Sequence, residues 1–220
     1  MKFYFLSVLE YWPLVLRGLW LTLAASGLGL IFSLIIGAIV VMARLSQSRI
    51  LVWAAAVYIE FGRNLPFIIV LFLLFYVLPA YGFQLPAFVV GVIALSMYAG
   101  AYFAEIIRGA IRSVPKGQME SARAVGMSRA QALRHIVFPQ MIGYFIPPAT
   151  NQAVMVVKES SILSTITVTE LTMAGQIIQG YTYTPIEIFV TISVLYWALC
   201  TTISRIGNHL EILLQPWRRK

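Results

Sequence analysis

The sequence predicts an all-α membrane protein with five transmembrane helices. Of its 220 residues, 60% are hydrophobic and only 11% are charged, and the mean hydropathy is +0.85. Soluble domains carry about a quarter charged residues. Long uncharged stretches alternate with short basic segments, as in membrane spans joined by loops. We therefore expect residues 1–220 to form a single transmembrane domain.

The first span is expected at residues 19–42, which carry no charge. At about 1.5 Å per residue, this stretch is long enough to cross about 30 Å of hydrocarbon. Gly27, Gly29, Ser33 and Gly37 recur at intervals that place small residues along one side of a helix. Such a stripe predicts close packing against a neighbouring helix. We expect it to be ordinary bundle packing.

The second span, residues 52–78, is predicted to be interrupted. Glu60 and Arg63 lie within it, and Pro66 would end or kink the helix beside them. Ionisable groups near a span are costly unless they face a bundle interior, water or each other. Two interpretations remain open: Arg63 reaches the interface and pairs with Glu60 one helical turn away, or both residues line a solute pathway.

Three further spans are predicted, at residues 85–107, 136–157 and 186–205. In the fourth span overall, residues 136–157, Pro147 and Pro148 are expected to break the helix near its middle. Backbone groups freed inside a membrane must be satisfied by protein or by a water-lined cavity. The polar residues that follow the prolines are therefore pathway candidates: Asn151, Gln152, Lys158 and Glu159.

Positive charge predicts the orientation. Lys and Arg number 16 against 8 acidic residues, giving a net charge of +8, and they collect at residues 44–49, 105–135 and in the tail at 217–220. Because cytoplasmic loops are enriched in Lys and Arg, five spans place the N-terminus outside and the C-terminus inside. The same rule explains the excess of basic over acidic residues, so no nucleic-acid partner is needed to account for it. The N-terminus carries Lys2 but no cleavage-site pattern, so we expect no removable signal peptide.

A charged stretch between the third and fourth spans predicts a helix, a break and a second helix. Pro115 suits the first turn of a helix, and Gly126 can adopt the left-handed conformation that ends one. Ser128 with Gln131 three residues later has the form of a capping box. Residues 114–135 are therefore expected to present a short, rigid helix outside the bilayer.

These residues also carry a resemblance. Glu120-Ser121-Ala122, Gly126, Ile136 and Pro139 resemble the EAA loop of ATP-binding-cassette (ABC) importer permeases, with Ser121 and Phe138 as small departures from the family pattern. The resemblance extends over roughly residues 16–170 and is specific to permeases for polar amino acids. It includes a Y-x-E-x-x-R-x-x-P segment and further motifs, carried by Tyr58, Glu60, Arg63, Pro66, Glu105, Arg108, Asn151, and residues 158–161.

The resemblance implies a type I importer in a bacterial inner membrane. Two five-span permeases, identical or homologous, would form the path, with an ATPase dimer below and an extracytoplasmic solute-binding protein above. ATP and Mg would bind to the ATPase, because this sequence has no phosphate-binding loop. The implied ATPase-coupling residues are Glu120, Ser121, Ala122, Gly126 and Pro139. Glu120, if near the N-terminal turn of its helix, would also suit the positive end of the helix dipole.

The chain itself is expected to be non-catalytic, to bind no cofactor and to hold no metal. No nucleophile with an adjacent base is recognisable, and His135 and His209 have no ligand cluster around them. For a zwitterionic solute, Arg63 and Lys158 are candidate donors to a carboxylate. Glu60, Glu159, Asn151 and Gln152 are candidate acceptors or amide partners. A structural ion pair is the alternative for each.

Other functions would leave different signatures. An importer permease for another small solute, such as a metal ion, should show His or Cys in the path. A stand-alone secondary transporter would take up solute without an ATPase, and a membrane scaffold would show no solute-dependent ATP hydrolysis. The exact solute, and whether the permease pairs with itself or with a similar chain, are not predicted.

Overall fold

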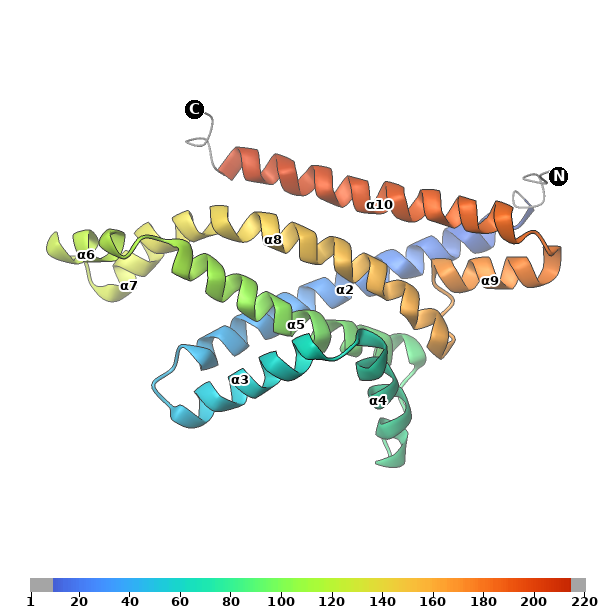
Figure 1. Ribbon diagram of the computed structural model, residues 1–220, viewed down its shortest axis with the longest axis horizontal. Coiled ribbons are helices and arrows are strands. Elements are labelled where there is room, and N and C mark those ends of the chain that lie inside the picture. The colour runs from blue at the N-terminus through green and yellow to red at the C-terminus, as the bar shows by residue number, and fades with distance from the viewer. Residues whose placement is uncertain (1–9, 215–220) are drawn as a thin grey trace.

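In the computed structural model, residues 10–214 are described, and they form an elongated bundle of helices (Figure 1). Lys2 and the basic tail at residues 217–220 lie outside the described residues. Three helices are long and apolar enough to cross a membrane, namely α2 (Trp12–Arg44), α5 (Ala87–Ser113) and α10 (Pro185–Leu214). The number rises to as many as five if each of two bent helix pairs counts as one span.

The packing of α2 against α5 follows the small-residue stripe. A side chain at Gly29 would place its Cβ 3.0 Å from that of Leu95, and one at Gly37 would come within 2.7 Å of the Phe103 Cβ. Ser33 is fully buried. Only Gly27 faces open space. The close packing predicted for this stripe is therefore confirmed, and it lets the two long helices cross without intervening side chains.

The second predicted span consists of two helices. Helix α3 (Arg49–Asn64) ends just before Leu65, and α4 (Phe67–Ala80) leaves at an angle of 108°. Leu65 is extended, as the residue before a proline prefers to be, and Pro66 caps α4. The interruption predicted at Pro66 is confirmed, but it is a sharp turn after which α4 projects from one side of the bundle, crosswise to its long axis (Figure 1).

The expected break at Pro147 and Pro148 is wrong. Helix α8 (Phe138–Glu159) runs through both prolines and continues from a π-helical turn, η1 (Leu133–Val137). The φ angle of proline is compatible with a helix. Because the two prolines are adjacent, the disturbance stays within one turn. Neighbouring helices in a bundle support a helix across such a turn.

A short helix, α9 (Leu171–Thr182), follows the 3₁₀ turn η2 (Ser160–Ile166). The residue that caps it, Glu170, is fully buried. Its carboxylate accepts hydrogen bonds from the backbone N–H groups of Thr172 and Met173, both at 2.9 Å. A buried carboxylate at a helix N-terminus satisfies donors that the helix itself leaves unpaired.

The same carboxylate joins α9 to both neighbouring long helices. Tyr196 on α10 donates its hydroxyl to Glu170 at 2.7 Å, and the Thr22 hydroxyl on α2 donates to the same carboxylate at 3.5 Å. The Thr22 hydroxyl also accepts from the Leu171 N–H at 3.1 Å. Gly18 on α2 leaves room for this approach, because a Cβ there would lie 2.9 Å from that of Ala174. Helix α9 is thus fixed between α2 and α10 by polar and apolar contacts together.

The two ends of the bundle differ. The short helices α6 (Lys116–Ala124) and α7 (Arg129–Ala132) lie at one end, near the last turns of α10. Helix α9 and the first turns of α2 lie at the other (Figure 1). The described chain therefore begins and ends at opposite ends of its long axis.

Candidate functional site

The α6–α7 segment has the local geometry that its sequence predicts. Gly126 has a φ of +86°, in the left-handed region that glycine tolerates best. The N–H of Gly126 donates to the Arg123 carbonyl at 3.0 Å, and that of Met127 to the Ala122 carbonyl at 3.1 Å. These bonds satisfy the last carbonyls of α6 and turn the chain away.

The capping box of α7 is also confirmed. The Ser128 hydroxyl accepts from the Gln131 N–H at 3.3 Å, and the Gln131 side chain accepts from the Ser128 N–H at 2.8 Å. With both ends of the turn fixed, α6 and α7 keep a defined angle to each other. The segment is therefore a rigid unit rather than an open loop.

Few side chains attach this unit to the bundle. Ala122 and Ala132 are buried, and Gln140 at the start of α8 donates to the Gln118 side chain at 3.2 Å. Glu120, Ser121 and Pro139 are exposed. The expectation that Glu120 lies near the N-terminal turn is wrong, because Glu120 is the fifth residue of α6 and the first turn holds no acidic residue.

A shallow hollow opens beside the turn between the two helices. Its volume is about 420 Å³, and its lining combines apolar and polar side chains, those of Val125, Met127, Gln131 and His135, with Gly126 at the turn itself. Val125 is 76% exposed, although it is aliphatic. An exposed aliphatic side chain beside a hollow on a rigid unit is suited to contact with another protein.

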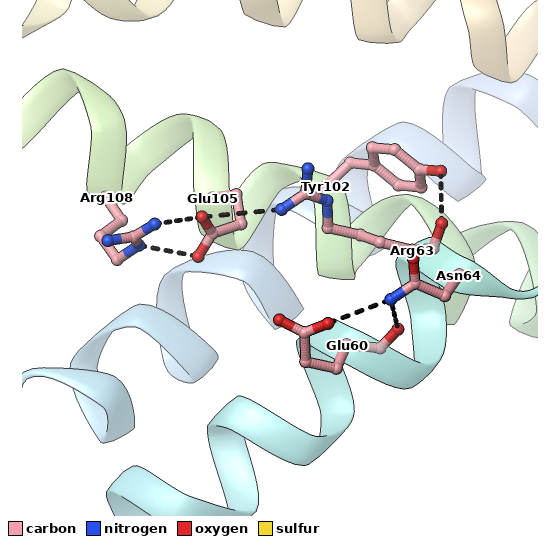
Figure 2. A network of polar contacts seen from close by, with 6 residues as sticks. All are labelled: Glu60, Arg63, Asn64, Tyr102, Glu105 and Arg108. Atoms are coloured by element: carbon pink, nitrogen blue, oxygen red, sulfur yellow. Dashed lines mark hydrogen bonds and ion pairs between the residues drawn. The ribbon is translucent and has the colours of Figure 1, made fainter.

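A second cluster of polar residues lies where α3 meets α5, and Figure 2 shows it. The interpretation that Arg63 pairs with Glu60 is wrong. The Glu60 carboxylate instead accepts from the Asn64 side chain at 3.0 Å. The Arg63 guanidinium lies 3.7 Å from the carboxylate of Glu105 on α5. The pairing therefore crosses between helices instead of following one helix.

Glu105 is held more firmly by its own helix. The Nε of Arg108 donates to one carboxylate oxygen at 2.7 Å, and a terminal guanidinium nitrogen donates to the other. A bidentate pair of this kind fixes the orientation of the carboxylate. Arg63 thus faces a carboxylate that already has a partner, at a distance beyond hydrogen-bond range.

Tyr102 orients Arg63, but the hydrogen-bond donors of the Arg63 guanidinium remain unused. Its guanidinium lies 5.8 Å from the centre of the Tyr102 ring, and the Tyr102 hydroxyl donates to the Arg63 carbonyl at 3.3 Å. The Arg63 side chain is 45% exposed. Among the described residues its guanidinium makes no hydrogen bond, so its donors remain available to an anion.

The site residues predicted from the sequence did not include Tyr102, Glu105 or Arg108, although Glu105 and Arg108 belong to the motifs that carry the resemblance. A signal was present, because a Glu and an Arg three residues apart inside an apolar span are expensive unless paired.

The four candidates on α8 separate onto two faces. Gln152 is buried and Glu159 is half-buried, whereas Asn151 and Lys158 are exposed. Positions seven residues apart lie two turns apart on the same side of a helix. Gln152 and Glu159 therefore share an inward face, and Asn151 and Lys158 share an outward one.

The inward face of α8 packs against α5, where Val156 lies in one apolar cluster with Leu95 and with the partly buried Tyr98. The Tyr98 and Tyr102 hydroxyls are 3.3 Å apart. The structure thus directs Arg63 toward α5, against Tyr102 and Glu105, whereas Glu60 bonds to Asn64 on its own helix.

Residues 29–212 match the family described as the inner membrane component of binding-protein-dependent transport systems. The chain belongs to this family. Such inner membrane components are the permease subunits of ABC importers, and this chain is one of them. The match begins within α2 and ends within α10, so it covers α6, α7 and the α3–α5 cluster alike.

Individual permeases of the family are similar along nearly the whole chain. The probable amino-acid ABC transporter permease YckA of Bacillus subtilis is 36% identical over 203 residues, or 92% of this chain and 90% of YckA. The L-cystine transport system permease TcyB of the same organism is 35% identical over 212 residues, or 96% and 91% of the two chains. A crystal structure of an amino acid ABC transporter with histidines superposes with a TM-score of 0.90 at 35% identity, covering 96% and 99%.

Proposed function

We propose that this permease carries polar amino acids or related compounds across a bacterial inner membrane, driven by ATP hydrolysis on a separate ATPase. The observation that carries the proposal is the similarity to amino-acid permeases along 92–96% of the chain. It includes the α6–α7 unit as well as the polar cluster between α3 and α5.

The α6–α7 unit is the proposed docking site for the ATPase, which would hold ATP and Mg. Its support is a rigid local geometry combined with few attachments to the bundle. Glu120, Ser121 and Gly126 lie on its exposed surface, while Ala122 packs inward, and Pro139 is exposed at the start of α8. Closure of an ATPase dimer could move such a unit as a rigid body and carry α5 and α8 with it.

The wider assembly follows from the same proposal. Two permeases, identical or homologous, would each supply five spans, with the N-terminus outside and the C-terminus inside. A solute-binding protein would dock at the end that carries α9. The opposite placement of α9 and the α6–α7 unit supports this arrangement (Figure 1).

The path for a zwitterion needs a donor for the carboxylate and an acceptor for the ammonium. Arg63 is the donor best supported, because its guanidinium is exposed and oriented. Lys158 is the second donor candidate. Glu60, Glu159, Asn151 and Gln152 remain the candidate acceptors or amide partners, and their exposures differ as described above.

Reconstitution tests the proposal directly. The chain would be co-expressed with candidate ATPase, partner permease and binding protein, and then placed in liposomes with a panel of amino acids. We expect ATP hydrolysis and uptake to rise with one liganded binding protein. Uptake by the chain alone, driven by an ion gradient, would instead establish a secondary transporter. No uptake of any amino acid by an assembled complex would refute the amino-acid assignment.

A further inference from the structure

The turn between α9 and α10 holds one residue in a conformation that its side chain disfavours. Tyr183, which follows the last residue of α9, has a φ of 53° and a ψ of 31°, in the left-handed region. Within residues 10–214, the only other non-glycine residue with a positive φ is Thr167. Bulky residues rarely adopt this conformation, and glycine is the usual residue where a helix ends in it. The chain thus carries a tyrosine where glycine would be less strained.

Contacts within the turn hold Tyr183 in this conformation. The N–H of Tyr183 donates to the Gln179 carbonyl at 2.9 Å, and the Thr182 and Thr184 hydroxyls on either side lie 2.7 Å apart. Pro185 then begins α10 with a φ that is fixed by its ring. The direction in which the Tyr183 side chain leaves the backbone is therefore defined.

The Tyr183 side chain makes little use of the rest of the bundle. It is 85% exposed, more than any other large hydrophobic side chain among residues 10–214. Tyr181 beside it is 70% exposed. Residues 171–186 carry no charge, and the next charged residue, Glu187, is buried. Packing within this chain does not offset the strain at Tyr183, and the surface around it is aromatic and uncharged.

This surface lies at the end of the bundle opposite to the α6–α7 unit (Figure 1). A strained residue that is held in place by its surroundings is characteristic of a functional site. Exposed tyrosines without charged neighbours are typical of the centre of a protein–protein interface. Anchoring in the lipid–water interface requires only that an aromatic ring lie at the right depth, which an unstrained tyrosine provides equally well. A defined direction is needed for contact with another protein.

We infer that the ring of Tyr183 is an anchor contact for the solute-binding protein and that the strained turn serves to present it. The partner's pocket would be uncharged and would enclose the ring, because nothing on this side supplies an ionic contact. The inference rests on the proposed function, in which a binding protein docks at the end that carries α9. It assigns that docking to one side chain.

The test measures ATP hydrolysis by the reconstituted complex against the concentration of the liganded binding protein that the reconstitution selects. Tyr183→Gly is expected to raise the concentration for half-maximal stimulation about ten-fold, while saturating binding protein restores the wild-type rate. The same variant should raise the midpoint of thermal unfolding of the permease–ATPase complex by about 2 °C, because glycine relieves the strain. A side chain that only supports the fold would lower that midpoint.

Two further variants separate the ring from the backbone. Tyr183→Ala removes the ring but keeps a Cβ, so it should weaken docking as much as Tyr183→Gly does without raising the midpoint. Thr167→Gly is the matched control, because it relieves the same kind of strain at the other exposed position. It should raise the midpoint and leave the half-stimulating concentration unchanged.

The outcomes distinguish this inference from the proposed function. If no liganded binding protein stimulates the wild-type complex, the proposed function fails and the inference fails with it. If the wild type is stimulated and Tyr183→Gly responds at the same concentrations, only the inference is overturned. Equal weakening of docking by Thr167→Gly would also overturn it. A lower midpoint for Tyr183→Gly in lipid nanodiscs, with docking unchanged, would assign Tyr183 to membrane anchoring instead.

Discussion

The two short helices at the ends of the bundle, α6 and α9, differ in how much of their surface is buried and in how their polar groups are bonded. Helix α9 has four buried residues, and its cap, Glu170, is bonded to groups on α10 and on α9 itself. Helix α6 has one buried residue, Ala122, and its charged side chains are exposed. The polar groups at the start of α9 are satisfied within this chain, whereas most of the α6 surface remains exposed and available for contact with another protein. Substitutions at α9 should therefore change stability, and those around α6 should change assembly.

The largest effect is expected for Glu170→Ala. The backbone N–H groups of Thr172 and Met173 would lose their acceptor inside the bundle, and the Tyr196 hydroxyl would keep only its bond to the Thr172 hydroxyl. Removing a buried charge also relieves a desolvation cost. Two orphaned backbone donors and the lost tyrosine bond outweigh this, and the free energy of unfolding should fall by about 3 kcal/mol.

Thermal unfolding of the purified permease–ATPase complex in detergent measures this loss. Glu170→Gln, which keeps one acceptor oxygen, should lose less. Glu10→Ala is the matched control, because Glu10 is exposed and lies outside the α6–α7 unit. A Glu170→Ala complex as stable as the Glu10→Ala complex would contradict the role given to Glu170.

A smaller loss of stability is expected for Tyr196→Phe. This change deletes one hydroxyl that donates to the Glu170 carboxylate at 2.7 Å. Hydrogen bonds to charged groups contribute about 2 kcal/mol. Tyr181→Phe on α9 is the control, since Tyr181 is 70% exposed. The same thermal measurement applies, and equal midpoints for the two variants would contradict the role given to Tyr196.

At the other end, Gly126→Val should impair assembly. A β-branched side chain at a φ of +86° costs about 1.5 kcal/mol, so the turn would rearrange and the affinity for the ATPase should fall about ten-fold. Titration of the ATPase against the permease measures this change. Gly126→Asn, which tolerates the left-handed region, should lose less. Wild-type affinity and ATP-driven uptake in Gly126→Val would show that the turn does not fix the docking surface.

The smallest effect is expected for Ser128→Ala. Loss of a cap costs about 1 kcal/mol, which corresponds to a reduction of about five-fold in affinity for the ATPase. Ser113→Ala is the control, because the Ser113 hydroxyl donates only to the Gly109 carbonyl of its own helix. The titration used for Gly126 applies here, and indistinguishable affinities for the two serine variants would exclude a role for the capping box in docking.

Features fixed by neighbouring residues could be predicted from the sequence. The left-handed Gly126, the capping box at Ser128 and the interruption at Pro66 depend on a few consecutive residues, and all three are confirmed. The small-residue stripe of α2 was predicted from helical periodicity, which is also local information.

Features fixed by distant residues were missed or misjudged. Arg63 pairs across helices with Glu105, so the spacing between Glu60 and Arg63 gave no guide to its partner. Pro147 and Pro148 were expected to break α8, but support from the surrounding bundle does not show in the sequence of one helix. Glu170 stands alone among apolar and hydroxyl residues, and only the fold shows that Thr22 and Tyr196 meet it.

The contacts of Glu170 with Thr22 and Tyr196 also determine when this part of the bundle can form during synthesis. Thr22 lies in the first long helix and Tyr196 in the last, so these contacts cannot all form until almost the whole chain has left the ribosome. Until then, a carboxylate with an incomplete set of partners is present in the nascent chain. A polypeptide that stops short of α10 would keep this buried carboxylate without the Tyr196 hydroxyl, and would be less stable for that reason.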